Sequence, residues 1–561
     1  MASHTAMSDV QIVVMAPPED QQQNRPQVTP REYVDVVSAH TKQATNASLY
    51  PGHNFENLAS FLQRSFDPPY ERTSSLPRLD SPGFLVTLHA IHASKPRSIH
   101  HFASEGDLIK SVEVGKDGPL SGSGILFLRG QPSLGWLAVI GAMLRIDPEY
   151  FQSHLDFRAA FGRLDYYPLP SLPSYSNHII KLRYVTIGHR NLRRRDADQR
   201  DIDHLRSHGH SEMRRYLHAL NQALESRIGP GDSIVREYLV HDLTHFTIEQ
   251  DISLCVTRTE DGWVALVWLD TGRDLASGPE GPWLELEDRD TTWPSTSFYP
   301  TIQHQPRVGL KPHRTAIPQN ERPSLRFVQS ASLLPLDYGK FLDPVLMASD
   351  PFYAMNDLFQ FVAYAEVQFL NMMEATVAEE TGYLSLTKES QLTNLLHSHD
   401  VFEAHAKRLR QNVETIRFRG GPDWPRTTDA ALYQKREAAA ESLLRDYEHL
   451  LSRAEALSVR CQRGMDVMIN KSILTESKKA IDQAQEVTKL TRLAFIYIPL
   501  SFTTSIFSMN LKPISDGPHN FWLWLVVSMP ILLATLAPLI LDISAIPRKA
   551  KVAWIKFLNL E

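Results

Sequence analysis

The sequence predicts an α+β domain, followed by a long stalk helix and two C-terminal transmembrane α-helices. Strand and helix signals alternate between about residues 84 and 330. From Asp429 the chain is rich in Ala, Glu, Leu, Lys, Gln and Arg, which favour helices, and no proline follows until Pro499. Two uncharged apolar runs then lie near the C-terminus. Each of these runs is long enough to cross a bilayer core.

The composition excludes several classes of protein. The 561 residues include 58 Lys and Arg against 64 Asp and Glu, a net charge of −6 that argues against a nucleic-acid binder. The two cysteines, Cys255 and Cys461, are too few for a disulfide-stapled secreted protein or a cysteine-rich zinc protein. Hydrophobic residues make up 42% of the chain, as in a soluble protein, but they are concentrated near the C-terminus.

Order is expected to begin near residue 29. The preceding residues are polar, rich in Pro and Gln, and lack the features of a signal or transit peptide, so they predict a disordered tail. Thr29 is a natural N-cap, Pro30 suits the first helical position, and Glu32 completes a capping box. A second short helix is expected over 54–66.

The α+β domain is expected to contain a β-hairpin and several helices. The runs FLVTLHAI and ILFLRG predict strands, whereas SLGWLAVIGAMLRI and SEMRRYLHALNQALESRIG predict helices. ISLCVTRT and WVALVWLD flank a Glu-Asp-Gly turn and predict a hairpin. The proline-rich stretch 293–323 predicts an irregular connection.

No assembled catalytic or metal site is apparent in this domain. Candidate metal ligands are the histidines at 89, 92, 100, 101, 208 and 210. No Cys or acidic residue lies at a spacing that would complete a metal site with them, so structural roles are favoured. His241, Asp242 and His245 resemble a hydrolase fragment without identified partners. We therefore expect neither an enzyme nor a bound cofactor.

A heptad pattern marks the predicted stalk helix, residues 429–492. Apolar or small residues recur in steps of four and three, as on a helix packed against helical neighbours. The clearest of them are Leu443, Tyr447, Leu450, Ala454, Leu457 and Cys461. An ordinary helical hairpin broken at Gly464 is the alternative.

Two membrane spans are predicted after the stalk, at 493–511 and 521–541. Lys and Arg gather before the first span and after the second, whereas the connecting loop has Lys512 as its only Lys or Arg. The positive-inside rule then places both termini, and the α+β domain, in the cytosol. The predicted segments are a disordered tail (1–28), α+β cytosolic domain (29–345), helical segment (346–428), stalk (429–492), first span (493–511), outer loop (512–520), second span (521–541) and basic tail (542–561).

One face of the first span continues the heptad steps and becomes hydroxylated toward its outer end. Its residues are Val487, Leu490, Ala494, Ile498, Ser501, Ser505 and Ser508. Serines facing a shared axis can contact hydrated ions, or they can hydrogen-bond between packed helices. Both interpretations fit the pattern. Pro499 removes one backbone donor in this span and permits a kink.

The segment KLTRLAFIYIPLSFTTSIFSMNLK, with its short loop, Trp-rich second span and basic tail, resembles the CorA family of divalent metal transporters. Upstream segments such as GDSIVREYLVHD resemble the divergent fungal-type branch. The family's first span ends in Gly-Met-Asn, an ion-selecting motif matched here by Ser508, Met509 and Asn510. The resemblance implies a homopentamer in the lipid bilayer with an axial pore lined by the first span.

This resemblance implies a passive channel for a divalent cation, Mg²⁺ first. The lack of a transit-peptide pattern favours the plasma membrane over the mitochondrial inner membrane as its location. Asn510 would face the hydrated ion, and Leu490 and Ile498 would form hydrophobic constrictions. In the outer loop Lys512 repels cations and Asp516 offsets it. The alternative is a non-conducting, membrane-anchored scaffold or sensor with a cytosolic interaction domain.

Overall fold

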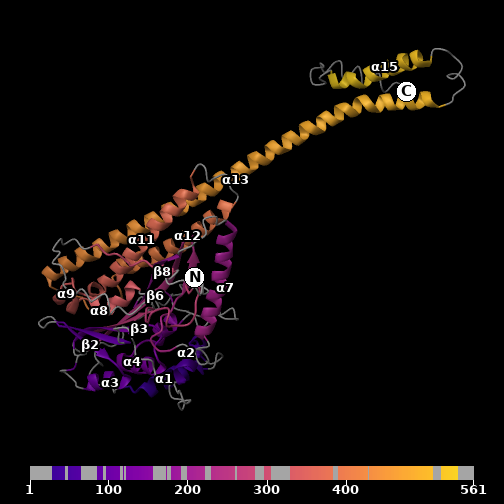
Figure 1. Cartoon of the computed structure of the whole chain (residues 1–561). Coiled ribbons are helices and arrows are strands. Elements are labelled where there is room, and N and C mark those ends of the chain that lie inside the picture. Colours follow the sequence, from indigo (N-terminus) through magenta and orange to yellow (C-terminus); the bar gives the residue numbers. More distant parts are fainter. Residues whose placement is uncertain are drawn as a thin grey trace, which may run out of the picture. The chain divides into compact units, whose positions relative to one another are not determined.

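A computed structural model gives the structure of this chain (Figure 1). It describes residues 28–43, 48–64, 85–92, 97–113, 118, 122–155, 172, 178–190, 199–221, 229–259, 262–284, 296–304, 329–382, 390–421, 423–426, 429–509 and 520–540. The predicted tail before residue 28, the outer loop up to residue 519 and the basic tail lie outside these residues.

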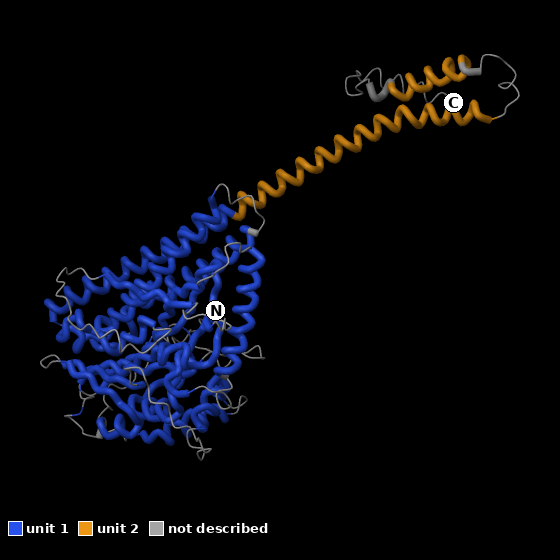
Figure 2. The backbone as a smooth tube through the Cα atoms, in the orientation of Figure 1, with its two compact units in different colours: residues 1–464 blue, residues 465–561 orange. Residues whose placement is uncertain are grey.

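The described residues form two compact units, residues 1–464 and residues 465–561 (Figure 2). Unit 1 contains every described strand and the N-terminal half of the long helix α13, Ala430–Ser508. Unit 2 contains the rest of α13 and the helix α15, Asn520–Ile540. The 79-residue α13 confirms the predicted long C-terminal helix and runs through Gly464 without the break that the alternative required.

An eight-stranded mixed sheet forms the centre of unit 1. Its order is β2-β1-β3-β7-β6-β4-β8, and β5 pairs with β6 beside this path. Among the described strands, β3 and β7 pair in parallel and the other pairs are antiparallel. The strands are β1 Val86–Ile91, β2 Ser98–Phe102, β3 Ser123–Arg129, β4 Ile179–Arg190, β5 Glu237–Val240, β6 His245–Arg258, β7 Trp263–Leu269 and β8 Thr296–Phe298.

The centre of the sheet is covered on both faces. Every residue of β3 and of β7 is buried, which explains why both strands read as continuous apolar runs rather than as alternating patterns. Leu126 and Trp268 belong to the core cluster on one face. Phe127, which points to the other face, meets the ring of Tyr338 at a centroid distance of 5.2 Å.

The first helical layer packs on the face that carries Trp268. It contains α1 Pro30–Thr41, α2 Glu56–Gln63, α3 Glu105–Glu113, α4 Leu134–Leu144, α5 Pro148–His154 and α7 Gln199–Asn221. The capping box at Thr29 and Glu32 is confirmed and starts α1 with Pro30 at its first position. The Tyr33 hydroxyl then donates to the Ile146 carbonyl at 2.9 Å, which fixes α1 against the end of α4.

The second helical layer covers the opposite face of the sheet (Figure 1). It contains η5 Ser330–Leu333, α8 Leu334–Asp337, α9 Pro344–Ser349, α10 Pro351–Ala354, α11 Asn356–Glu380 and α12 Ser390–Phe418. Tyr184 of β4 packs edge-on against Phe361 of α11, with ring centroids 5.4 Å apart. Unit 1 is therefore a sheet between two layers of helices, so the predicted α+β domain is confirmed.

Several local predictions are confirmed and two are corrected. The hairpin forms between β6 and β7, closed by the Thr259 amide donating to the Gly262 carbonyl at 3.0 Å. Helix α7 begins at Gln199, twelve positions before the predicted start. The prediction missed these positions because the charged residues of the first turns obscure the apolar spacing. The proline-rich stretch contains the short strand β8, which adds to β4 at the sheet edge, where proline-flanked segments are tolerated.

Buried charges cross the middle of the sheet. Asp251 of β6 and Asp270 after β7 are fully buried. Arg236 donates from Nε to Asp270 Oδ2 at 2.7 Å and from Nη2 to Oδ1 at 2.9 Å. Arg183, directly opposite Asp251 on β4, donates to its two oxygens at 2.8 and 3.2 Å. Because each carboxylate is paired, the cost of its burial is offset by charge-assisted hydrogen bonds.

These pairs hold the carboxylates ionised. Burial alone raises the pKa of Asp251, but the cations of Lys181, Arg183 and Arg236 outweigh it and place that pKa well below its ordinary value. The same balance lowers the pKa of Asp270, where Arg236 and His154 oppose burial. The central strand β6 is thus stable only while the cations that pair with Asp251 and Asp270 remain in place.

We expect Arg236→Met to lower the free energy of unfolding by about 3–5 kcal/mol, because it leaves buried carboxylate charge uncompensated. Urea unfolding of the full-length chain in detergent measures this loss. Arg215, which is 75% exposed and pairs with Glu212 on α7, provides the matched control. Arg215→Met should change the same free energy by less than about 0.5 kcal/mol. Equal losses in both variants would contradict the assigned role of the buried network.

Candidate ion-conduction segment and its link to the sheet

The predicted ion-conduction residues lie in the C-terminal part of α13, within unit 2. Ser508 is the last residue of this helix and Met509 follows it, with the Met509 amide donating to the Ile506 carbonyl at 3.2 Å. Asn510, Lys512 and Asp516 lie outside the described residues. The non-glycine residues with positive φ in the described part of the chain are Arg145 and Arg419, so Ser508 adopts a backbone that does not require glycine.

The C-terminal part of α13 has two different faces. Pro499 and Thr503 are buried, although most neighbouring side chains are exposed. The predicted pore face, by contrast, includes Val487, Leu490 and Ile498, which are 61%, 67% and 65% exposed in the single chain. At 3.6 residues per turn these two sets fall on roughly opposite sides of the helix. The face that carries the predicted pore residues is therefore open.

The buried face of α13 has a counterpart on α15. Ser528 of α15 is 4% exposed and Thr503 of α13 is 2% exposed, whereas most side chains around both are solvent-accessible. These two helices share unit 2, so burial at these positions indicates the faces through which they pack. Small hydroxylated residues at a helix contact allow close approach within a membrane.

Two serines of the open face, Ser501 and Ser508, hydrogen-bond to their own helix. Ser501 Oγ donates to the Ile498 carbonyl at 3.0 Å, and Ser508 Oγ donates to the Ser505 carbonyl at 2.8 Å. A hydroxyl has one donor and two acceptor lone pairs. Because the hydrogen is used within the helix, each serine presents an acceptor oxygen on its exposed side. Such an oxygen suits a hydrated cation or a donor on another helix.

The predicted heptad seam is buried in unit 1. Its six clearest residues, from Leu443 to Cys461, are each at most 6% exposed. The Tyr447 hydroxyl donates to the Phe359 carbonyl of α11 at 2.9 Å, so the seam packs against the second helical layer of its own chain. Farther along, in unit 2, the seam position Leu490 is 67% exposed. The heptad pattern is confirmed as a packing face only in its N-terminal half.

One helix among the described residues is long and apolar enough to cross a membrane, and it is α13. Only 11% of its most apolar window is buried within the chain. In α15 the described apolar stretch, Trp522–Leu536, is shorter than the length needed. The predicted second span is thus a helix in the structure, while its role as a membrane span remains a prediction.

A buried ionic junction joins α12 to the sheet and was not predicted from the sequence. Arg408 of α12 donates to the two oxygens of Glu249 on β6 at 2.6 and 2.8 Å. His405, one turn earlier, meets Glu249 Oε1 at 3.4 Å through Nε2 and Glu366 Oε1 of α11 at 2.7 Å through Nδ1. The His405 ring also stacks on Phe369 with centroids 4.1 Å apart. The junction fixes α12, α11 and β6 together.

The two carboxylates favour the protonated form of His405. Burial lowers the pKa of His405, but Glu366 and Glu249 outweigh it, and the net pKa lies above the ordinary value. Both ring nitrogens face carboxylate oxygens, and only imidazolium carries a proton on each nitrogen. The sequence signal for this junction is the run Glu249-Gln250-Asp251, which places two carboxylates in the middle of a strand.

The candidate histidine motifs have structural roles. His89 is buried on β1 and contacts the Pro335 carbonyl at 2.7 Å. Asp242 accepts from the amides of Thr244 and His245 at 2.6 and 2.7 Å, as in an Asx-type turn, and contacts the His245 ring at 2.9 Å. Among the described residues no group of three or more His, Cys, Asp or Glu side chains has the arrangement of a metal site.

Comparison with known families concerns the C-terminal part of the chain. Residues 393–541 match the family described as CorA-like Mg²⁺ transporter protein. We call these residues, which are similar to that family, the CorA-like domain. No curated protein matches this chain. The predicted resemblance to CorA transporters is confirmed, whereas assignment to the fungal-type branch stays a prediction.

The CorA-like domain includes most of α12, all of α13 and all of α15. His405 and Arg408 therefore belong to this domain, while their partner Glu249 belongs to the sheet that precedes it. The junction is an ionic contact through which the sheet holds the first helix of the CorA-like domain.

We expect the stability of the folded chain to depend on the charge of His405. Because its folded pKa lies above the unfolded value of about 6.5, its contribution is complete below that pH and is lost as the pH rises through the folded pKa. Wild type should lose more unfolding free energy than His405→Gln between about pH 6 and about pH 8.5. Urea titrations at both pH values measure this difference.

His208 of α7, which is 42% exposed, is the control position for this experiment. His208→Gln should keep the wild-type dependence on pH. If His405→Gln also keeps it, His405 does not carry the predicted charge.

Proposed function

We propose that this protein is a membrane channel that passively conducts a divalent cation, most directly Mg²⁺, through an axial pore lined by α13. The observation that carries the proposal is the match of residues 393–541 to a family of Mg²⁺ transporters. The open face of α13 supports it, because a pore-lining helix needs one face free of the second span. The driving force is the membrane potential, about 2.3 kcal/mol per charge per 100 mV.

A single α13 cannot enclose a pore, so the proposed channel is a homo-oligomer. Val487, Leu490 and Ile498 leave large apolar surfaces open in the single chain, and such surfaces are typical of contacts between subunits or with lipid. Around a shared axis, these side chains form hydrophobic constrictions that gate by dewetting. The pentamer is inferred from the resemblance to the CorA family.

The proposed selectivity mouth is Ser508, Met509 and Asn510, at the end of α13. Mg²⁺ loses its water reluctantly, so neutral oxygen atoms that accept hydrogen bonds from the hydration shell are suitable ligands. Ser508 offers such an oxygen, because its hydrogen is donated to the Ser505 carbonyl. Asn510 adds an amide oxygen, and Asp516 in the outer loop offsets the repulsion from Lys512.

In the proposed topology α13 and α15 both cross the bilayer and both termini are cytosolic. The support is the uncharged length of each predicted span and the Lys and Arg residues that flank them on one side. The junction at His405 then lies in the cytosol. The plasma membrane is the proposed location.

Liposomes that contain the purified protein should take up Mg²⁺, and Asn510→Ala should reduce the initial rate about tenfold or more, a change of about 1.4 kcal/mol in the barrier. The matched control is Asn470→Ala, an exposed asparagine of α13 far from the proposed mouth. Ser508→Gly, which restores the family motif but removes the serine oxygen, should still conduct, because Asn510 keeps its amide oxygen. A fluorescent Mg²⁺ indicator inside the liposomes measures each rate.

Uptake should be measured with several divalent ions and at both signs of the membrane potential. If neither the assembled wild type nor Ser508→Gly takes up any of these ions, the proposal of a channel is contradicted. That result would favour the non-conducting scaffold or sensor, for which Lys512 at the mouth is the supporting observation.

Cysteine labelling tests the two-span topology with little background, because the native Cys255 and Cys461 are both buried. We expect Asp516→Cys to react with an impermeant maleimide on intact cells. Glu476→Cys, an exposed position of α13 before the first span, should react only after permeabilisation. Labelling of Glu476→Cys on intact cells would contradict the proposed orientation.

A further inference from the structure

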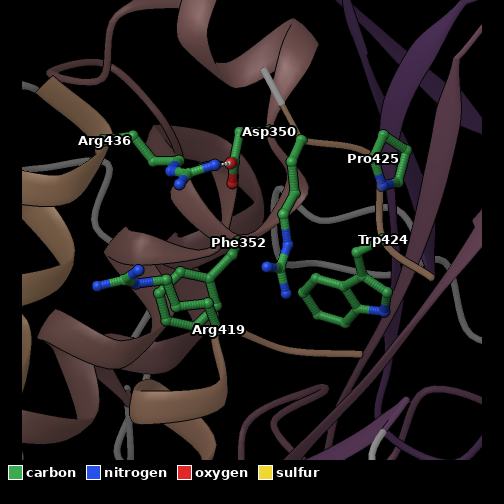
Figure 3. Close-up of a pocket in the computed structure, with 7 residues that line it drawn as sticks. Asp350, Phe352, Arg419, Trp424, Pro425 and Arg436 are labelled. Carbon is green, nitrogen blue, oxygen red and sulfur yellow. Dashed lines mark hydrogen bonds and ion pairs between the residues drawn. The ribbon is translucent and has the colours of Figure 1, made fainter. Parts of the chain in front are cut away.

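Two buried polar features lie at the two ends of α12, and the first is a small cavity where α12 connects to α13. Asp350, Arg419, Trp424 and Arg436 are among the residues that line it (Figure 3). Its volume is about 10 Å³, which is room for about one water molecule. This cavity is therefore too small for a ligand.

The second feature is Glu380, the last residue of α11, near the start of α12. Its Oε2 is buried and has no hydrogen-bond partner in the part of the chain that the structure describes. A buried carboxylate without a donor is costly when it is charged. A negative charge at the C-terminal end of a helix also faces the negative end of the helix dipole. Both conditions disfavour the ionised form of this side chain.

Arg206 of α7 attracts the Glu380 carboxylate, but its donors are used elsewhere. Its Nε donates to the Val240 carbonyl at 3.1 Å and its Nη2 donates to the His241 carbonyl at 3.2 Å. Its Nη1 donates to Asn394 Oδ1 at 2.7 Å. Because these bonds hold the guanidinium, Arg206 acts on Glu380 through its charge at a distance and leaves Oε2 without a donor.

Glu380 therefore changes its charge near neutral pH. Burial raises its pKa to about 7; Arg206 opposes this shift, and the charges of Glu379 and Asp242 add to it. From α13, the thiol of Cys461 also faces this carboxylate. Burial raises the pKa of that thiol to about 12, so the thiol stays neutral while Glu380 titrates.

The end of α11 is also where unit 1 holds the last part of its segment of α13. Arg460 of α13 donates to the hydroxyl of Thr381, the residue after Glu380, at 3.0 Å. A β-carbon on Gly464 would lie 3.0 Å from Leu395 Cδ1 and 3.2 Å from Thr381 Cγ2. Glycine at 464 thus lets α13 approach the end of α11 and the start of α12 closely. Unit 1 ends at this glycine.

We propose that Glu380 is a pH switch that controls how tightly unit 1 holds α13 at Gly464. In its neutral form, Glu380 stays buried and the ends of the three helices pack together. In its ionised form, the carboxylate moves toward water, because its buried position offers no donor to compensate the charge, and the contact loosens. The proposal does not depend on ion transport.

The direction of the pH effect follows from the two states of the contact. The pKa of Glu380 is about 7 when the contact is closed, and about 4.3 is the ordinary value in water. The closed contact therefore binds the proton more tightly than the open one. Its stability is greatest at acidic pH and is lost as the pH rises through about 7.

Hydrogen–deuterium exchange of the full-length protein in detergent tests this switch at pH 6 and pH 8. Each rate is corrected for the intrinsic pH dependence of amide exchange. In wild type, the amides of α13 between residues 455 and 464 should lose protection by up to about tenfold at pH 8, as expected for one carboxyl that titrates in this range. Glu380→Gln keeps the shape of the side chain without its charge, and its protection should be nearly equal at both pH values.

The matched control is Glu379→Gln, an exposed glutamate one position earlier, which should retain the wild-type loss of protection. His405→Gln removes the protonated histidine of the α12 junction and should also retain the loss at residues 455–464. Equal protection of wild type at both pH values overturns the proposal, and this result does not depend on any variant. A wild-type loss in Glu380→Gln, or the disappearance of the loss in His405→Gln, also overturns it.

Discussion

The burial of three carboxylates at the middle of the sheet constrains the rest of unit 1. Glu249, Asp251 and Asp270 are all at most 1% exposed, so each must be paired with cations where it lies. The cations come from β4, from the segment before β5 and from α12. The strand register, the loop after β7 and the second helical layer must therefore all be positioned so that these ion pairs form together. An apolar core of the same volume would not impose this set of partners.

The same constraint reaches the CorA-like domain through α12. Arg408 and His405 extend from this helix to Glu249, while Tyr447 of α13 bonds to the backbone of α11. The start of the CorA-like domain is thus built into the second helical layer of the N-terminal sheet. In unit 2, by contrast, only 11% of the most apolar window of α13 is buried within the chain.

Some features of the site were predictable because they are local. The heptad spacing from Leu443 to Cys461 correctly predicted a buried helix face, and the capping box correctly predicted the start of α1. The hydroxylated face of the first span was predicted from its spacing, and its residues are open in the structure. The helix α7 was shortened in the prediction, because the signal of an amphipathic helix weakens where charged residues crowd its first turns.

The sequence by itself determined the helical period of α13, its uncharged C-terminal run and the match of residues 393–541 to the CorA-like family, because each depends on residues close together in the chain. The tertiary structure alone decided which charges meet. Arg408 pairs with Glu249 across 159 positions, and no local pattern selects that partner. It also decided that the seam of α13 packs on its own chain, and that Arg419, Trp424 and Arg436 surround one cavity. Such contacts depend on how the helices pack against the sheet, and the spacing of residues along the sequence does not specify that packing.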